Sequence, residues 1–358
     1  MVQNKTFKLF SNCIPVKGAK RSTICDLQRN EVKLIPNDLA EILIKYEGKA
    51  IGEIKVIYQN KYDSIIDEYF EFLLENEFIF FTNQPELFPK MSLDWEDPSV
   101  INNAIIDRDS NSNYDLYNIL DQLDELNCRH IELRYFNSIE LTEILDILKY
   151  LENAQSTIIS VDVTMPYNES LRNLNDVIIK NKRLASFKIF NSLEDTFTPP
   201  LKENMGFIIY TKKQIKNSSC CGLISKDFFV VNTPLFTESV NHNSCLNHKV
   251  GIDVDGNIKN CPSMKKSFGN VLSQTLEECL NKKTFKKYWK VKKDNINICK
   301  DCEFRHICTD CRAFIEDPND IYSKPLKCGY NPYTNEWKDW STNKLNIKTI
   351  QSYHLDGK

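Results

Sequence analysis

The sequence predicts an α/β protein built from three successive parts and a short tail. The first part mixes short alternating apolar runs with helical periodicity, and the second alternates strands with helices of about ten to fifteen residues. The third part holds most of the cysteines, since only three of the 13 precede position 220. The predicted bounds of these parts are 1–90, 91–238 and 239–335, followed by a tail over 336–358.

Composition limits the class of protein. The 358 residues are 41% hydrophobic and 27% charged, which is typical of a soluble globular protein. No apolar run approaches the ~18 to 20 residues of a membrane span, and the first residues lack the pattern of a secretion signal. We therefore expect a cytoplasmic protein without a membrane partner. A net charge of −3 gives no basis for general nucleic-acid binding, so we expect no nucleic-acid partner.

The first part predicts a few small strands and three helices. The segment "TFKLFSNCIPV" alternates like a strand, and "STICDLQRNEVKLIP" is typical of a hairpin that turns near Gln28 to Asn30. After Pro36, Asn37 can cap a helix, and two further helical patterns follow before the apolar segment "FIFF". Small strands and three helices in so short a segment predict a winged-helix-like module.

The text "VKGAKRSTICDLQRNEVKLIPNDLAEIL", followed by "YFEFLLENEFI", resembles the peptide-recognition element of ribosomal-peptide maturation enzymes. The resemblance implies that the leader of a precursor peptide adds a strand to the sheet edge beside the third helix. The expected edge is Ser22 to Asp26 or its hairpin partner, Glu31 to Leu34. The residues expected to contact the peptide are Thr23, Ile24, Tyr69 and Leu73. The alternative is an ordinary winged helix that binds DNA or serves packing, although the acidic segment "SIIDEYFEFLLE" would repel phosphates.

The second part alternates strand and helix patterns. The segments "RHIELRYF", "TIISVDVTM" and "LASFKIF" have the composition of strands, and "LTEILDILKYLEN" and "SLRNLNDVIIKN" between them have helical periodicity. Such alternation is typical of βαβ units and a parallel sheet. We expect a partial β/α barrel.

This part resembles the barrel of radical S-adenosylmethionine (SAM) enzymes, but two of their motifs are missing. Those enzymes hold a catalytic cluster with C-x3-C-x2-C, and this sequence contains no such triplet. Where they have a Gly-Gly-Glu-Pro-like turn, this chain has "LRYFNSIEL", with bulky Tyr135 and Phe136. The resemblance therefore implies a degenerate barrel for which SAM is not an expected cofactor. An unrelated α/β domain is the alternative.

The third part contains cysteines at close, regular spacing. "CLNHKVGIDVDGNIKNC" gives C-x10-G-x4-C from Cys245 to Cys261, with a hairpin turn at Asp255-Gly256. "NICKDCEFRHICTDC" gives C-x2-C-x5-C-x2-C, and one more cysteine follows in "PLKCGYNP". In a reducing compartment such spacing is more typical of metal ligation than of disulfides. The four cysteines that fall outside this pattern and in apolar contexts are predicted to be core thiols: Cys13, Cys25, Cys128 and Cys279.

The order of these cysteines resembles the SPASM domain, which holds auxiliary [4Fe-4S] clusters in peptide-modifying radical SAM enzymes, although the family has three residues in the last gap where this chain has two. The resemblance implies two [4Fe-4S] clusters, one held by Cys299, Cys302, Cys308 and Cys328 and the other by Cys245, Cys261 and Cys311. The second of these sets lacks one ligand, for which the candidates are His242, which we favour, His248, Cys220, Cys221 or an open iron site. Zinc is the alternative metal, because four thiolates also suit a zinc ribbon.

Together the three parts resemble the SPASM-domain peptide maturase of grasp-with-SPASM ribosomal-peptide systems. The resemblance implies a precursor leader and an ATP-grasp ligase as partners. Our first hypothesis is an iron–sulfur accessory protein without SAM chemistry, which binds the leader and presents the precursor to the ligase. The second is a redox enzyme that acts on the precursor through its clusters, and the third is a zinc-stabilised winged-helix regulator. The sequence leaves open whether the chain itself catalyses a step.

Overall fold

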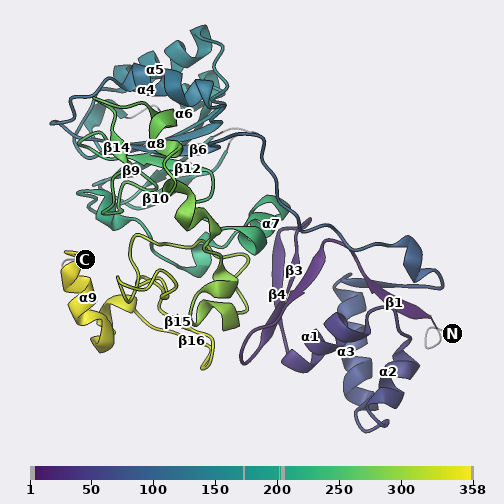
Figure 1. Cartoon of the computed structure of the whole chain (residues 1–358). Helices are drawn as coiled ribbons and strands as arrows, with labels where there is room; N and C mark the ends of the chain where they lie inside the picture. The colour runs from purple at the N-terminus through teal and green to yellow at the C-terminus, as the bar shows by residue number, and fades with distance from the viewer. Residues whose placement is uncertain (1–4, 172–173, 201, 203–205, 356–358) are drawn as a thin grey trace.

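The computed structural model describes residues 5–171, 174–200, 202 and 206–355. Over these ranges the chain is a mixed α/β protein, with an N-terminal module at one end and the largest sheet at the other (Figure 1). The C-terminal residues, green to yellow in the figure, pack against both. None of the described helices is long and apolar enough to cross a membrane.

The N-terminal module contains two small antiparallel sheets and three helices. Its core is apolar and is formed by side chains from both sheets and all three helices, among them Phe7, Ile24 and Phe70. The elements are β1 (Thr6–Leu9), β2 (Cys13–Val16), β3 (Ser22–Asp26), β4 (Glu31–Ile35), α1 (Asn37–Tyr46), α2 (Ile51–Ile57), α3 (Asp63–Glu75) and β5 (Ile79–Thr82).

The three-stranded sheet of this module has the order β2-β3-β4. The predicted hairpin is confirmed, because β3 and β4 pair directly and Asn30 takes φ +58 in the turn between them. However, β3 also pairs with β2, so it is the central strand. The expectation that Ser22 to Asp26 forms the free edge is therefore wrong, and its hairpin partner β4 is an edge of this sheet.

The largest sheet has nine strands in the order β10-β11-β9-β8-β7-β6-β12-β13-β14. The six strands from β11 to β12 run parallel to their neighbours, and the strands outside them pair antiparallel. The strands are β6 (Asn103–Arg108), β7 (His130–Tyr135), β8 (Ser160–Pro166), β9 (Leu184–Phe190), β10 (Thr196–Thr198), β11 (Phe207–Tyr210), β12 (Lys249–Ile252), β13 (Asn257–Lys259) and β14 (Gly269–Asn270).

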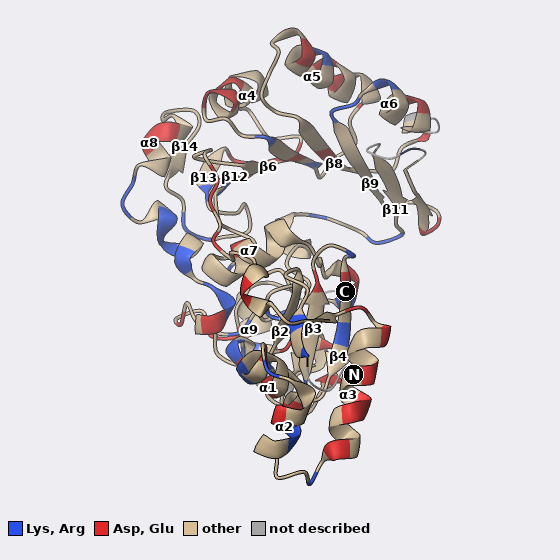
Figure 2. Ribbon diagram, turned by 90° about the vertical axis from the view of Figure 1, so that its right-hand side faces the viewer, with Lys and Arg blue, Asp and Glu red and all other residues tan. Residues whose placement is uncertain are grey.

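The two faces of this sheet differ in chemistry, because side chains alternate along each strand. One face carries Ile106, Leu133 and Val163 and packs in the main core, and the helices α4 (Leu116–Glu125), α5 (Leu141–Asn153) and α6 (Leu174–Lys180) cover it (Figure 2). The other face carries charged side chains, including the buried ion pair of Asp107 and Arg134, whose closest atoms lie 2.6 Å apart. This charged face is turned toward the cysteine-rich residues (Figure 2).

The sheet includes strands from both the second and the third predicted parts of the chain. Strand β12, which follows Cys245, pairs in parallel with β6. The remaining helices are α7 (Thr233–Asn241), α8 (Leu276–Leu280) and α9 (Ile347–Ser352), and a last small sheet pairs β15 (Tyr330–Asn331) with β16 (Glu336–Trp337). Between them lie single 3-10 turns: Pro85–Leu87, Glu169–Leu171, Ser218–Cys220, Lys226–Phe228, Phe285–Lys290, Lys293–Asn295, Cys299–Asp301, Trp340–Thr342 and Lys344–Asn346.

Candidate metal centre

The hairpin of β12 and β13 positions two of the cysteines. Its turn is set by Gly256, which has φ +78, and by Asp253, whose Oδ1 accepts a hydrogen bond from the backbone N–H of Asn257 at 2.9 Å. Cys245 precedes β12 and Cys261 follows β13. Both thiols therefore leave the hairpin at its open end, as the sequence predicts.

Four thiols lie close enough at this end to influence one another's ionisation. The pKa of Cys261 is raised to about 12, mainly by burial and also by the neighbouring Cys221 and Cys245. Burial also raises the pKa of Cys245 and of Cys311, and in both cases Cys221 is among the groups that add to the shift. We call Cys221, Cys245, Cys261 and Cys311 the first set.

The loop that carries Cys221 is held in place from two directions. Lys327 Nζ donates hydrogen bonds to the carbonyl oxygens of Ser219 and, at 2.8 Å, Cys221. Ser263 Oγ donates to the carbonyl of Ser218 at 2.9 Å. The next residue, Gly222, has φ +85, and a Cβ atom there would lie only 2.7 Å from Cys311 Sγ. The backbone thus passes directly beside the thiol of Cys311 at a point that favours glycine.

The other candidate side chains for the missing ligand, His242, His248 and Cys220, lie elsewhere. The ring of His248 stacks on Trp289, with centroids 4.8 Å apart. His242 follows the last residue of α7, and its ring packs against Trp95 with centroids 5.2 Å apart. Burial lowers the pKa of His242, and the charges that add to the shift are those of His248 and two lysines. Cys220 and Cys221 are both exposed, but the Sγ of Cys220 lies 3.9 Å from the carbonyl oxygen of Gln214. The structure places Cys221, and not the favoured His242, beside the other three thiols.

The remaining four cysteines form a second set: Cys299, Cys302, Cys308 and Cys328. A 3-10 turn over Cys299–Asp301 brings the first two together, because Cys302 N donates to Cys299 O at 3.0 Å. Burial raises the pKa of Cys299 to about 12, with further contributions from Cys328 and Cys308. Burial also raises the pKa of Cys302, and Cys299 and Cys308 add to that shift. The four thiols assigned together from the sequence are neighbours in the fold.

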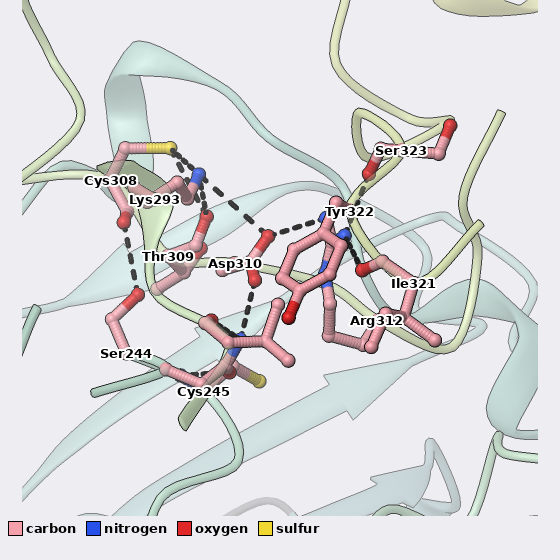
Figure 3. Close-up of polar contacts among 12 residues, drawn as sticks. Ser244, Cys245, Lys293, Cys308, Thr309, Asp310, Arg312, Ile321, Tyr322 and Ser323 are labelled. Atoms are coloured by element: carbon pink, nitrogen blue, oxygen red, sulfur yellow. Dashed lines mark hydrogen bonds and ion pairs between the residues drawn. The ribbon is translucent and has the colours of Figure 1, made fainter. Parts of the chain in front are cut away.

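Each set has a lysine ammonium beside it, which the sequence analysis missed. Lys293 is 3% exposed, and its Nζ donates to Cys308 Sγ at 3.3 Å (Figure 3). Lys249 Nζ donates to Cys245 Sγ at 3.8 Å. These cations lower the pKa of the thiols they contact, against the effect of burial. Nothing in the sequence distinguishes Lys293 from the other lysines of the basic run "KKTFKKYWKVKK". Lys249, by contrast, lies between Cys245 and Cys261, at the start of the strand that links these two candidate ligands.

The second set is in direct contact with the N-terminal module. Glu303, which follows Cys302, accepts hydrogen bonds from Arg21 Nε at 2.7 Å and from the hydroxyl of Tyr330 at 2.5 Å. Its backbone carbonyl accepts a hydrogen bond from Thr23 Oγ1 at 2.9 Å. Strand β3 therefore docks the module onto the loop that carries Cys302.

This docking changes the roles of the residues expected to bind a peptide. Thr23 and Ile24 are fully buried, and Leu73 is fully buried in the core of the module. The structure thus presents none of these three side chains at its surface, and the peptide-binding role expected of them stays a prediction. Tyr69 is partly buried at the edge of that core and remains accessible.

The structure also shows where Tyr135, the bulky residue noted in the barrel prediction, lies in the fold. Tyr135 is 1% exposed and packs in the main core on the helix-covered face. Its side chain therefore does not lie on the charged face of the sheet. The absence of the C-x3-C-x2-C triplet from the sequence is the remaining reason not to expect SAM as a cofactor.

The residues of both sets fit an iron–sulfur cluster. A [4Fe-4S] cluster needs about four thiolates, one for each iron, and each set offers four cysteines and a lysine cation. The backbone at Gly222 passes close to Cys311, whose pKa is raised by burial and by the other three thiols of its set. Within the described ranges, no three His, Cys, Asp or Glu side chains converge tightly enough to hold a single metal ion.

The comparisons with known proteins bear on the third part of the chain. No curated protein matches the sequence. Residues 245–303 match the family model of the SPASM iron-sulfur cluster-binding domain. The match includes Cys245, Cys261, Cys299 and Cys302, and so spans members of both sets. The chain therefore contains a SPASM domain, a domain that binds iron–sulfur clusters.

Proposed function

We propose that this protein is an iron–sulfur accessory protein of ribosomal-peptide maturation, which holds two [4Fe-4S] clusters and binds the leader of a precursor peptide. In this role it presents the precursor to an ATP-grasp ligase. The observation that carries the proposal is the arrangement of eight cysteines as two sets of four inside and next to a SPASM domain. The N-terminal module, docked on the second set, is the candidate leader-binding part.

The completeness of both sets supports an accessory role. With Cys221 included, each cluster would have a cysteine ligand for every iron, and no iron would remain open to a substrate. When bound, such clusters supply one-electron transfer and stabilise the loops that ligate them. The family match favours iron–sulfur clusters over zinc for these thiols.

The edge strand β4 supports peptide recognition by strand addition. Lys33 and Leu34 are exposed, and within the described residues β4 pairs only with β3. The opposite edge is less suitable, because β2 contains Pro15, which has no N–H to donate. Helix α3, acidic in Figure 2, presents the exposed Ile65 and the partly buried Tyr69 on the same module. A leader with apolar anchors and basic side chains would suit this edge and this helix.

A redox enzyme is the second candidate function, and one observation favours it. The charged face of the large sheet adjoins the first set, since Arg134 lowers the pKa of Cys261 and Cys221 raises the pKa of Arg134. Glu132 and Lys188 lie on the same face, 3.6 Å apart. A polar substrate bound there would be next to a cluster that can exchange an electron.

Metal and sulfide analysis tests the proposal. We expect full-length protein, purified without oxygen, to contain about eight irons and about eight acid-labile sulfides per chain, with broad thiolate-to-iron absorption. Stoichiometric zinc without sulfide would contradict it. A titration with labelled leader of the precursor encoded with the gene then separates the candidates. Binding without any change to the peptide supports the accessory role, whereas a cluster-dependent change in the mass of the precursor supports the enzyme.

A further inference from the structure

A buried polar chain begins at the second set of cysteines. Lys293 Nζ donates hydrogen bonds to Cys308 Sγ at 3.3 Å and to the carbonyl oxygen of Thr309 at 3.0 Å (Figure 3). The carboxylate of Asp310 lies 4.0 Å from the same nitrogen. Because Lys293 and Asp310 are only 3% and 1% exposed, water screens these charges poorly.

The chain continues to the first set. Asp310 accepts a hydrogen bond from Arg312 Nη2 at 2.7 Å and another from Asn243 Nδ2 at 2.5 Å. Asn243 Oδ1 in turn accepts a hydrogen bond from the backbone N–H of Cys245 at 3.1 Å. Polar contacts therefore run without a break from Cys308 in the second set to the backbone of Cys245 in the first.

The charges along this chain do not cancel. Asp310 is one anion between two cations, and it is closer to Arg312, at 2.7 Å, than to Lys293, at 4.0 Å. The nearest group to the ammonium of Lys293 that can carry a negative charge is thus the sulfur of Cys308. A buried ammonium is costly unless an anion offsets it, and a cluster with four thiolates is an anion.

We infer that Lys293 raises the reduction potential of the cluster held by the second set, through its charge and its hydrogen bond to Cys308. The inference rests on the proposed function, since it requires a [4Fe-4S] cluster at these cysteines. Reduction adds one electron from an external reductant such as dithionite and makes the cluster more negative. A fixed cation and an N–H···S bond stabilise that state more than the oxidised one. Lys293 is a positioning residue here, acting through a ligand.

Redox titration monitored by electron paramagnetic resonance tests the inference. Full-length protein, loaded and purified without oxygen, is compared with Lys293→Met, which removes charge and donor, and Lys293→Gln, which removes only the charge. We expect wild-type iron and sulfide content and a more negative midpoint potential for one of the two titrating signals. The shift should be smaller in Lys293→Gln. A wild-type midpoint in the loaded Lys293→Met protein would overturn the inference.

Lys300→Met is the matched control. Lys300 lies between Cys299 and Cys302 in sequence but is exposed, so water screens its charge, and the midpoint should stay at the wild-type value. A shift as large as that of Lys293→Met would mean that any nearby positive charge has the same effect and would contradict a specific role.

Asp310→Asn tests the same charge effect on the midpoint potential, with a shift in the opposite direction. This variant keeps the shape of the side chain and removes a negative charge near Lys293, so the midpoint should become less negative. It also keeps the inference testable if the neutral variants at position 293 fail to load. Loss of iron from all three variants would assign these residues to cluster assembly and overturn the inference. Wild-type protein that holds zinc and no sulfide would contradict the proposed function instead.

Discussion

At the scale of single residues, Cys221 and Cys220 are adjacent in sequence but have different surroundings. We predict that Cys221→Ser lowers iron and sulfide to about half of the wild-type content, because the first cluster loses a thiolate and serine is a poorer ligand for iron. Iron and sulfide assays on protein purified without oxygen provide the measurement.

Cys220→Ser is the control for this prediction. Both side chains are exposed, but the Sγ of Cys220 lies 3.9 Å from the carbonyl oxygen of Gln214, so the content should stay at the wild-type level. Equal losses in both variants would mean that the loop as a whole is needed, and would remove the distinction between the two thiols.

Seven of the eight cysteines in the two sets could be proposed from the sequence, because short spacings such as C-x2-C bring thiols together whatever the surrounding fold. The choice of Cys221 could not be made in the same way. It depends on Lys327 and Ser263, which hold the loop from distant positions in the chain. The same limit applies to Lys293, whose burial is decided by packing and not by its basic neighbours. The core thiols Cys13, Cys25, Cys128 and Cys279 were predicted correctly, and all four are buried.

At the scale of elements, strand β4 is the place where a leader would pair. The backbone N–H groups of neighbouring residues in a strand point to opposite sides. Val32→Pro and Lys33→Pro therefore each remove one N–H group, one of which faces β3 and the other the free edge. We predict that one variant weakens leader binding by about tenfold while the module stays folded, and that the other disrupts pairing with β3. Fluorescence titration with labelled leader and circular dichroism measure the two effects.

Leader affinity that is unchanged in both folded variants would contradict strand addition at β4. The control is a charge change on an exposed residue away from this edge, Lys266→Glu in the loop before β14, which should leave the affinity unchanged.

Which strand forms the edge was outside the reach of the sequence. The hairpin of β3 and β4 was predictable from its turn, but the side on which β2 pairs depends on the path of the chain through the whole module. The alternation of strands and helices in the second part predicted the parallel sheet correctly, since each whole connection from β6 to β7, β7 to β8 and β8 to β9 is long enough for a crossover. Within "KKTFKKYWKVKK" the residues Phe285–Lys290 form a 3-10 helix, in which Phe285 and Trp289 are buried.

At the scale of the whole molecule, the missing C-x3-C-x2-C triplet makes a chemical prediction. Loaded protein incubated with SAM and dithionite should release no 5′-deoxyadenosine above a control without protein, as measured by liquid chromatography. Cluster-dependent turnover would mean that one of the two cysteine sets binds and cleaves SAM.

The contact between the N-terminal module and the second set makes another prediction. Glu303 has a fully buried side chain, so Arg21→Met leaves its charge without the partner at 2.7 Å. We expect the free energy needed to open the module to fall by about 3 kcal/mol, which would be measured as faster hydrogen exchange in β3. Lys17→Met removes a more exposed ion pair, that with Glu41, and should change the free energy of opening by less than about 0.5 kcal/mol. Equal effects would show that Glu303 does not fasten the module.

The pairing of β6 with β12 has a consequence for the synthesis of the chain. Strand β6 leaves the ribosome long before β12, and until then the polar groups along one of its sides have no strand to bond with. A nascent chain that ends near residue 238 therefore exposes a sheet edge in the middle of its largest domain. Translation of the cysteine-rich residues closes that edge, so we expect the segment that carries both sets of cysteines also to protect the unfinished protein from aggregation.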